Sequence, residues 1–319
     1  MKKKFLKLFK GKVILVTGGT GSIGSEIVRQ LLQYKPKQIR VYSRDESKHF
    51  FLQHELELLH ARVDIRYLIG DIRDKERLDK AFNNVDIVFH AAALKHVPFC
   101  EYNPFEAVKT NVYGTQNVID AALKYNVSKV VAISTDKAVY PNTIMGVTKL
   151  LMERMIISSM HYAGEAKTKF AVVRFGNVLN SRGSVIPMWV EQIKRGGPVT
   201  VTDKRMTRFF MSIPEAVHLI FLAAITMRGQ EIFVLKMAER NMYELAQETI
   251  AKHGNGKKIK IRIVGARERE KLREKLHTEE ENEYLKEKKS FFVIYPDRDL
   301  YEKREKTVYK VKSQVNGSG

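Results

Sequence analysis

A strand, a glycine-rich turn and the start of a helix near the N-terminus constrain the fold of this chain most strongly. Residues 12–17 are an apolar, β-type run, and three spaced glycines follow before a helical pattern begins. In this arrangement the first glycine permits a tight turn, the second lets the backbone approach a pyrophosphate, and the third lets the helix pack against the strand. Free N–H groups at the helix start favour a phosphate. We therefore predict a dinucleotide site formed by Gly18, Thr20, Gly21, Ser22, Ile23 and Gly24.

β-type runs and helical patterns then alternate, which is typical of an α/β fold with a doubly wound parallel sheet. The predicted strands are residues 12–17, 38–42, 64–69, 86–90, 130–133 and 169–175, with 232–235 returning to the same sheet. Open sheets of this kind bind ligands at the carboxyl edge. We therefore expect further cofactor contacts just after strands two to four, from Ser43, Arg44, Asp71, Ile72, Ala91, Ala92, Ala93 and Lys95.

The residues after the second strand bear on the choice of cofactor. A carboxylate there would grip the ribose 2′-hydroxyl of NAD, whereas an arginine accommodates the 2′-phosphate of NADP. Ser43 and Arg44 come first, so we predict NADP, while Asp45 leaves NAD as the less favoured alternative. Asp71 can accept a hydrogen bond from an adenine amino group, or cap the next helix. Lys95 can reach a ligand phosphate or carbonyl group.

Polar residues at the end of strand 130–133 form the predicted catalytic centre. They are Thr135, Asp136 and Lys137, and Lys149 follows on a helix. An adjacent carboxyl and amine can give and take protons where their surroundings separate the two pKa values. The alternative is a surface ion pair worth about 0–1 kcal/mol, which a position at the carboxyl edge disfavours. Asn111 lies mid-helix, where it needs a partner; we expect it to hold a water or the backbone at the cofactor site.

The pattern changes after residue 177. Residues 178–208 mix glycines with basic residues, which suits loops that close over a second, phosphorylated ligand. Helices are predicted at 104–123, 213–227 and 242–251, a strand at 258–264, and a charged helix or turn at 267–289. We expect a dinucleotide-binding domain (11–177 plus 209–238), a smaller substrate-binding lobe (178–208 plus 239–310), and flexible ends (1–10 and 311–319).

The charge of the chain favours anionic partners. Lys and Arg number 56 against 36 Asp and Glu, a formal net charge of +20. No nucleic-acid-binding motif accompanies the excess, so we expect phosphorylated small molecules and no nucleic acid. The single cysteine, Cys100, excludes an internal disulfide and fits a reducing compartment. No run approaches the ~20 apolar residues of a membrane span. We therefore expect a cytoplasmic protein without integral membrane contact, a solvated leader over residues 1–10, and no metal site.

Several segments resemble the extended short-chain dehydrogenases/reductases, and more narrowly the soluble UDP-N-acetylglucosamine 4,6-dehydratases of bacterial polysaccharide and pseudaminic-acid biosynthesis. The most specific are Ser134-Thr-Asp-Lys137 and Met206-Thr-Arg-Phe-Phe-Met211. The others are the glycine-rich turn and the segments 43–46, 91–98, 109–112, 138–141, 174–177 and 181–187. The resemblance runs from Thr17 to about Leu276. It implies a Rossmann domain with a C-terminal lobe, a UDP-sugar substrate, and a homo-oligomer. It also implies substrate contacts from Lys95, Asn177, Arg182, Val185, Arg208, Arg267 and Glu270.

The resemblance also implies roles for the catalytic residues. Oxidation at C4 of the sugar would acidify the C5 hydrogen, with Lys149 holding the nicotinamide ribose and Thr135 relaying the C4 proton. Lys137 would remove the C5 proton, which requires a lowered pKa, and Asp136 would protonate the departing C6 hydroxyl, which requires a raised pKa. Water would thus be lost and the hydride returned to C6.

Two departures from the family pattern are visible. Most short-chain dehydrogenases have a tyrosine base at the position of Met145. Several members of this branch resemble the present chain in having a methionine there. The usual Gly-x-Arg-Pro-Gly-Glu-Lys is here Gly265-Ala-Arg-Glu-Arg-Glu-Lys271, without its Pro-Gly. The alternatives are a 5,6-dehydratase that releases a 5,6-ene sugar, a nucleotide-sugar 4-epimerase, and a non-catalytic NADP-binding module.

Overall fold

A nine-stranded sheet forms the centre of the molecule. The computed structural model describes residues 1–58, 63–181 and 183–304. The sheet order is β13-β14-β10-β6-β5-β4-β1-β2-β3, and the seven strands from β10 to β3 are parallel. Their bounds are β1 Val13–Thr17, β2 Gln38–Ser43, β3 Asp64–Ile69, β4 Ile87–His90, β5 Lys129–Thr135, β6 Lys169–Phe175 and β10 Glu231–Leu235. The doubly wound parallel sheet predicted from the sequence is therefore confirmed.

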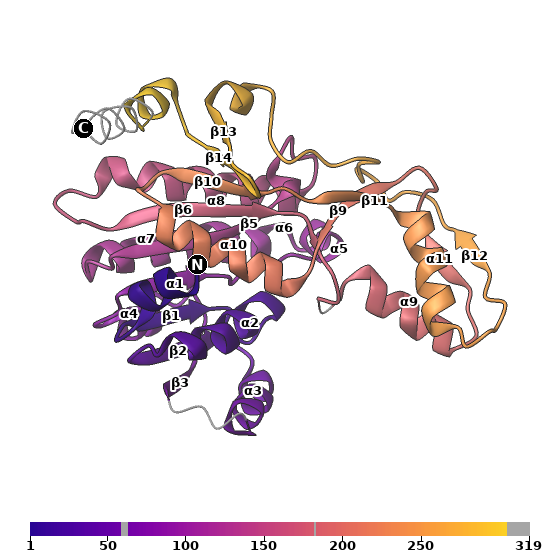
Figure 1. Cartoon of the computed structure of the whole chain (residues 1–319), viewed down its shortest axis with the longest axis horizontal. Helices are drawn as coiled ribbons and strands as arrows, with labels where there is room; N and C mark the ends of the chain where they lie inside the picture. Colours follow the sequence, from indigo (N-terminus) through magenta and orange to yellow (C-terminus); the bar gives the residue numbers. More distant parts are fainter. Residues whose placement is uncertain (59–62, 182, 305–319) are drawn as a thin grey trace, which may run out of the picture.

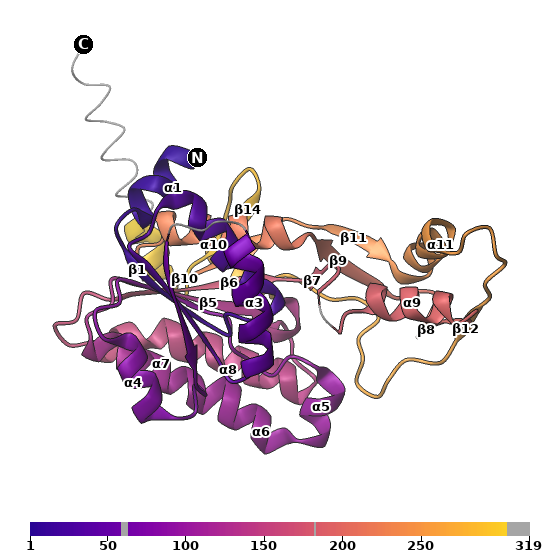
Figure 2. The ribbon, with the colours of Figure 1, turned by 90° about the horizontal axis from the view of Figure 1, so that it is seen from below.

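Helices cover both faces of this sheet, and the central strands β1, β4 and β5 are apolar because both of their faces are buried. Helices α1, α2, α3 and α10 share one core with the sheet, and α4, α7 and α8 share the other. Figure 2 shows α1 and α10 on one side of the strands and α4, α7 and α8 on the other. Their bounds are α1 Lys2–Phe9, α2 Ser22–Leu31, α3 Glu46–Leu58, α4 Lys75–Phe82, α7 Gly114–Lys124, α8 Ile144–Ser158 and α10 Ile213–Thr226.

A smaller lobe extends from the carboxyl edge of the sheet (Figure 1, right). It has its own apolar cluster around the buried Trp189 and two small sheets, β11-β9-β7 and β12-β8. Its elements are β7 Asn177–Val178, α9 Val185–Lys194, β8 Val199–Val201, β9 Thr207–Met211, β11 Ala238–Asn241, α11 Met242–His253 and β12 Ile261–Ile263. The expectation of loops alone over 178–208 is therefore wrong, because α9 buries Trp189 and Ile193 against this cluster.

The predicted helix over 104–123 is helical throughout, but its middle is a π turn. Short helices α5 Val97–Tyr102 and α6 Pro104–Val108 lead into a π-helical turn, Lys109–Tyr113, which continues as α7. The π turn inserts one extra residue per turn and is frequent at functional sites. It carries Asn111, which is 1% exposed.

The N-terminal segment is not a solvated leader. Residues 2–9 form α1, in which Phe5 and Phe9 are buried and pack against Tyr34 and Phe221. Burial of two aromatic rings offsets the cost of ordering this lysine-rich segment, which the charge pattern alone did not reveal. The expectation of a flexible end is wrong for residues 2–9; residues 311–319 lie outside the described residues.

The C-terminal region also differs from the prediction. The segment 267–289 contains turns, a 3₁₀ helix and strand β13 Leu285–Glu287, followed by β14 Phe291–Ile294. β14 pairs antiparallel with β10, and β13 pairs antiparallel with β14 at the edge of the main sheet, although the sequence assigned both strands to the lobe. The apolar run Phe291–Ile294 satisfies the backbone groups that β10 would otherwise expose at the sheet edge. The remaining domain boundaries stay a prediction.

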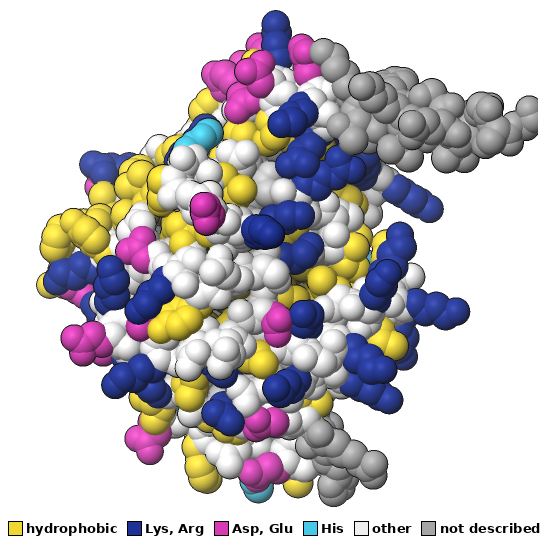
Figure 3. Space-filling view, turned by 90° about the vertical axis from the view of Figure 1, so that its left-hand side faces the viewer, with side chains coloured by type: hydrophobic (Ala, Val, Ile, Leu, Met, Phe, Trp, Pro, Cys, Tyr) yellow, Lys and Arg dark blue, Asp and Glu magenta, His cyan; other side chains and the backbone are white. Residues whose placement is uncertain are grey.

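Lys and Arg side chains spread over the end of the molecule opposite the lobe, as Figure 3 shows. The basic excess thus extends well beyond any ligand site. Within residues 1–58, 63–181 and 183–304, no helix is both long and apolar enough to cross a membrane.

Candidate active site

A cavity of about 1200 Å³ lies between the carboxyl edge of the sheet and the lobe. The glycine-rich turn and the ends of β4 and β5 line it from the main domain. From the other side it is lined by β7, the start of α9, Arg208 of β9 and the segment 264–271. Residues that are 250 positions apart in the chain therefore face one space.

The glycine-rich turn packs closely against its own backbone and the end of β4 only because it lacks side chains. Gly18 has φ +66°, and a Cβ there would lie 2.7 Å from the backbone nitrogen of Ala92. A Cβ on Gly24 would collide with the carbonyl of Gly18. Gly21 is the N-cap of α2 and forms no side-chain cap, and the first residues of the helix, Ser22 to Gly24, line the cavity. This geometry fits the pyrophosphate of a dinucleotide.

At the far end of this turn, the side chains that line the cavity are Ser43, Arg44, Lys48 and Asp71. The Ser43 hydroxyl lies 2.7 Å from that of Thr20, and Arg44 pairs with Asp71 at 3.5 Å. Asp45 does not line the cavity; its carboxylate caps α3 at Lys48 N. Two cations and one carboxylate thus surround the position predicted for a ribose 2′-substituent. Ile72, Ala91, Ala92, Ala93 and Lys95, which are predicted cofactor contacts, also line the cavity.

Asn111 lies behind the cavity wall instead of on it. Its Oδ1 accepts from Leu94 N at 2.8 Å, and its Nδ2 donates to Leu94 O at 2.9 Å and to Thr148 Oγ1 at 3.0 Å. The π turn therefore aims this side chain at the loop that follows β4. Of the two expected roles, holding a water or holding the backbone, these bonds support the second. The position behind the wall does not favour a direct contact between Asn111 and the cofactor.

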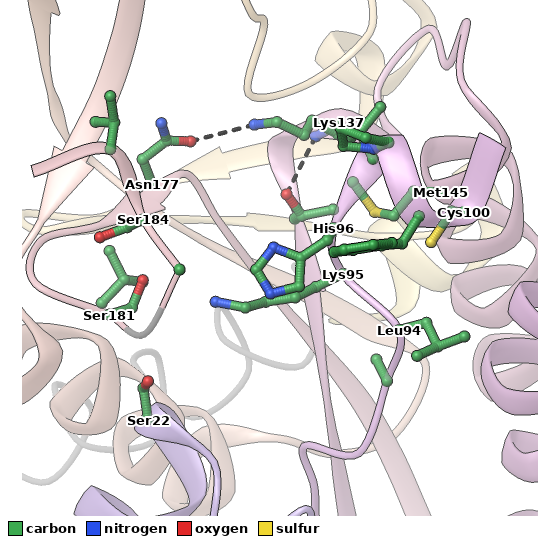
Figure 4. A pocket seen from close by; sticks show the side chains of 18 of the residues that line it. Ser22, Leu94, Lys95, His96, Cys100, Lys137, Met145, Asn177, Ser181 and Ser184 are labelled. Atoms are coloured by element: carbon green, nitrogen blue, oxygen red, sulfur yellow. Dashed lines mark hydrogen bonds between the residues drawn. The ribbon is translucent and has the colours of Figure 1, made fainter. Parts of the chain in front are cut away.

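The predicted acid and amine lie together at the end of β5. Lys137 Nζ donates to Asp136 Oδ1 at 3.0 Å. It also donates to Asn177 Oδ1 at 3.2 Å (Figure 4). Thr135 Oγ1 donates to the same Asp136 Oδ1 at 2.9 Å. Thr135 and Lys137 line the cavity, whereas Asp136 is fully buried beneath its wall, and its Oδ2 has no hydrogen-bond partner among the described residues. The surface ion pair considered as the alternative is excluded by this burial.

The pKa of Lys137 is shifted opposite to the prediction. Burial lowers the pKa of this amine, but the charges of Asp136 and Glu274 and the hydrogen bond to Asp136 outweigh burial and raise the pKa above its ordinary value. Glu274 Oε1 lies 3.6 Å from Lys137 Nζ. The lowered pKa expected from the sequence is therefore wrong for the structure as it stands, because a second carboxylate from the C-terminal segment faces the amine.

Lys149 behaves differently, although it lines the same cavity. Its amine donates to Ile133 O at 2.5 Å, and burial lowers its pKa to about 8. Beneath it, His90 bridges Thr17 at 2.7 Å and Thr115 at 3.1 Å. Burial and the charge of Lys149 lower the pKa of His90 to about 3, so this imidazole is neutral. Lys149 is thus the cavity amine whose charge changes most readily near neutral pH.

Met145 occupies the position of the usual tyrosine. It lines the cavity at the first turn of α8 and packs with Cys100 and Ala107, and Figure 4 shows its sulfur beside that of Cys100. A thioether cannot transfer a proton, so Met145 contributes shape here and no acid or base. Cys100 is a free, buried cysteine.

The predicted substrate residues Asn177, Val185, Arg208, Arg267 and Glu270 all line the lobe side of the cavity. Arg208, 5% exposed, donates to Thr207 O and Leu272 O and pairs with Glu270 at 3.3 Å. Arg182 lies outside the described residues.

The turn that replaces the family's Pro-Gly keeps a recognisable form. Glu270 N donates to Arg267 O at 3.0 Å, and Arg269 has φ +61° at the position where the pattern has glycine. The turn from Arg267 to Glu270 therefore forms despite the substitution. Arg269 adopts a left-handed conformation that glycine would adopt without strain.

Several cavity residues were not predicted, and two of them bear on the chemistry of the site. Glu274 and His96 both line the cavity, and His96 lies against Gly183. No sequence signal separates Glu274 from the other carboxylates of its charged stretch. The position of His96 directly after Lys95, on the loop following a strand, was the available signal for that residue.

A doubly wound sheet, a dinucleotide turn, and a lysine on the helix after β5 define the extended short-chain dehydrogenase/reductase class. The chain belongs to the polysaccharide biosynthesis protein family, whose model matches residues 14–296.

Similar proteins are known from archaea and bacteria. An "uncharacterized membrane protein" of Methanocaldococcus jannaschii is 54% identical over 95% of this chain and 92% of its own length. A Campylobacter jejuni protein named UDP-N-acetylglucosamine 4,6-dehydratase (inverting) is 42% identical over 92% of this chain and 85% of its own. The X-ray structure of Pen from Bacillus thuringiensis superposes with a TM-score of 0.88 at 46% identity, covering 90% of this chain and 89% of that one. Rickettsia relatives at 40–41% identity are named UDP-glucose 4-epimerase.

Proposed function

We propose that this protein is an NADP-dependent UDP-N-acetylglucosamine 4,6-dehydratase. The observation that carries the proposal is the Asp136–Lys137 pair, held at 3.0 Å at the carboxyl end of β5, between the dinucleotide turn and the lobe. A 4-epimerase needs oxidation at C4 but no acid/base pair for C5 and C6. The name of the Campylobacter relative agrees with this assignment, while the names of the Rickettsia relatives keep the epimerase as the second candidate.

The two sides of the cavity suit different ligands. The glycine turn fits the pyrophosphate of NADP, and Arg44 and Lys48 supply positive charge for a 2′-phosphate. When bound, the nicotinamide supplies the oxidation of the C4 hydroxyl and the later reduction at C6. On the other side, Arg208 and Arg267 offer forked donors that suit the UDP pyrophosphate.

The residues around the pair make the elimination possible. A ketone at C4 acidifies the C5 hydrogen, so that a base can remove it and expel the C6 hydroxyl. The positive form of Lys149 favours loss of the C4 hydroxyl proton, and Thr135, which donates to Asp136 Oδ1, relays that proton to the Asp136–Lys137 pair. Lys137 takes the proton from C5, and Asp136 protonates the departing hydroxyl. Lys137 returns a proton to C5 once the hydride has reached C6, and the proton from the C4 hydroxyl replaces the one given to water.

Lys137 can act as this base only after losing its own proton, because its resting pKa is raised. Asp136 Oδ1, 3.0 Å away, is the acceptor in reach. One transfer along this bond creates both forms that the elimination requires, a neutral amine and a protonated carboxyl group. A bound sugar favours the transfer because it excludes water from the pair, and a desolvated ion pair is costly.

A group of exposed apolar side chains supports association of the protein with itself. Phe99, Tyr102, Phe105 and Tyr113 of the α5 to α7 region and Leu151 of α8 are all more than a third exposed. Apolar patches of this kind mark interaction sites. We propose that this surface forms a homo-oligomer, measurable by light scattering.

The reaction itself separates the candidates. We expect purified protein with NADP and UDP-N-acetylglucosamine to give a product lighter by one water that reacts with a carbonyl-specific reagent. A product of that mass without carbonyl reactivity would indicate the 5,6-ene sugar. An isomer of unchanged mass would indicate an epimerase, and no turnover would indicate a binding module.

The role of Lys137 has its own test. Lys137→Ala should retain NADPH binding by fluorescence titration and lose water elimination by roughly 10²–10⁴-fold, the usual contribution of a general acid or base. Lys275→Ala, which removes an exposed lysine, is the matched control and should react normally. Normal product formation by Lys137→Ala would remove Lys137 from the mechanism.

A further inference from the structure

Glu274 is a buried carboxylate that faces the amine of Lys137, and no role in the proposed reaction accounts for it. It is 7% exposed and lines the cavity. Its Oε1 lies 3.6 Å from Lys137 Nζ and its Oε2 3.5 Å from Lys271 Nζ. Oε2 has no hydrogen-bond donor among the described residues. A buried carboxylate with so few hydrogen bonds is costly unless the charges that face it are fixed.

The chain around Glu274 fixes its position. Lys271 Nζ donates to Val139 O at 2.7 Å, just after the catalytic pair. On the lobe side, Thr207 N and Arg208 both donate to Leu272 O, at 2.9 and 3.2 Å. The chain just before Glu274 is therefore anchored to Val139 and to β9, and just after it Leu276 O accepts from Arg174 at 3.0 Å, so that Glu274 is held against the amine.

The charges that face Lys137 are unequal. Asp136 and Glu274 attract its proton, Arg208 opposes them from β9, and Lys271 offsets part of the Glu274 charge. Asn177 contributes a neutral acceptor. One carboxylate within 4–6 Å shifts a pKa by about 1–3 units, so removing Glu274 leaves a substantially different balance.

We propose that Glu274 is a positioning residue that holds the Lys137 amine beside Asp136 and sets its protonation in the free protein. Two consequences follow. Lys137 stays an ammonium group until a bound ligand changes the surroundings of the pair. The pH at which Lys137 can take a proton from a substrate is fixed by a carboxylate 137 residues further along the chain. The second consequence rests on the proposed function, whereas the first does not.

The first consequence is tested without turnover. Competitive labelling of the protein with acetic anhydride, read at Lys137 by mass spectrometry over pH 7–12, reports the pKa of this amine. In the unaltered protein it should titrate above the ordinary lysine value of about 10.4. In Glu274→Gln it should titrate about 1–3 units lower. In Glu274→Asp, which keeps the charge, the Lys137 pKa should stay close to that of the unaltered protein. Glu279→Gln removes an exposed carboxylate and should leave the Lys137 pKa unchanged.

The outcomes decide the proposal. An unchanged Lys137 pKa in a folded Glu274→Gln protein overturns it. If that variant does not fold, a Lys137 pKa at or below 10.4 in the unaltered protein overturns it equally. In turnover of UDP-N-acetylglucosamine, Glu274→Gln should shift the acidic limb of the kcat profile to lower pH by a similar amount. If neither the unaltered protein nor Glu274→Gln turns over this sugar, the proposed function fails. The labelling result still decides the role of Glu274.

Discussion

Lys137 and Lys149 line one cavity, yet their pKa values shift in opposite directions. Both are removed from water, which alone lowers the pKa of an amine. Lys137 faces two carboxylates within 4 Å, which reverses the effect. Lys149 donates to a neutral carbonyl, and Glu153, one turn along α8, only partly compensates for burial. The two amines therefore suit different tasks, one held charged and one able to change charge near neutral pH.

The lowered pKa of Lys149 predicts a pH dependence of stability. Its pKa is about 8 in the folded protein and about 10.4 when unfolded, so between these values the unfolded chain binds more protons. The free energy of unfolding should therefore rise with pH from about 8 to 10, by up to about 3 kcal/mol from this group. Urea unfolding of the unaltered protein and of Lys149→Met at pH 7.5 and 10 isolates this contribution, because other groups cancel. Parallel pH dependences in the two proteins would contradict it.

Single-residue predictions were reliable where the chain itself brings partners together. Asp136 and Lys137 are adjacent in sequence, and Gly18 and Gly24 are spaced by a local motif, so their geometry followed from local rules. The sign of the Lys137 pKa shift did not, because it depends on Glu274, which the fold brings from far along the chain. Burial of Asp136 beneath the wall was likewise a tertiary property.

Among the elements, the π turn Lys109–Tyr113 matters most for the site. It lies between α6 and α7 and directs Asn111 at both backbone groups of Leu94. The sequence placed this stretch correctly in a helix but could not show the extra residue in the turn, because helical periodicity is too coarse. In the same way, α9 was missed among glycines and basic residues, since its apolar residues face the small cluster of the lobe.

We expect Asn111→Ala to loosen the loop after β4. The change leaves Leu94 N and O without their partner in a partly buried position, where each unsatisfied group costs up to about 3 kcal/mol. The melting temperature should fall and NADPH should bind at least tenfold more weakly, as measured by thermal unfolding and fluorescence titration. Gln116→Ala, which removes only a local bond to Asp120 on the same helix, is the control. NADPH affinity equal to the control would show that Asn111 does not support the cofactor site.

At the scale of the whole molecule, the N-terminal helix α1 and the strand β14 near the C-terminus both pack against the main sheet. β14 covers the edge of β10, and Arg174 of β6, fully buried, binds Glu153 and Glu281 and so ties the C-terminal segment to α8. On one face of the sheet, α1 packs together with α10. The parallel sheet was predictable from the alternating patterns. These terminal contacts were not, because charge-rich segments with few apolar residues are interpreted as solvated.

The N-terminal helix provides the last prediction. Phe9 is fully buried, with its ring 4.9 Å from that of Phe221 in α10 and 6.1 Å from that of Phe89 in β4. Phe9→Ala should therefore lower the free energy of unfolding by about 3–5 kcal/mol, as a cavity in a packed core does. Leu6→Ala on the same helix removes a side chain that is 36% exposed and should change stability much less, by about 1 kcal/mol or below. Urea unfolding of both variants makes the comparison. Equal, small effects would mean that α1 does not belong to the core and that the lysine-rich segment is the solvated leader that its charge suggests.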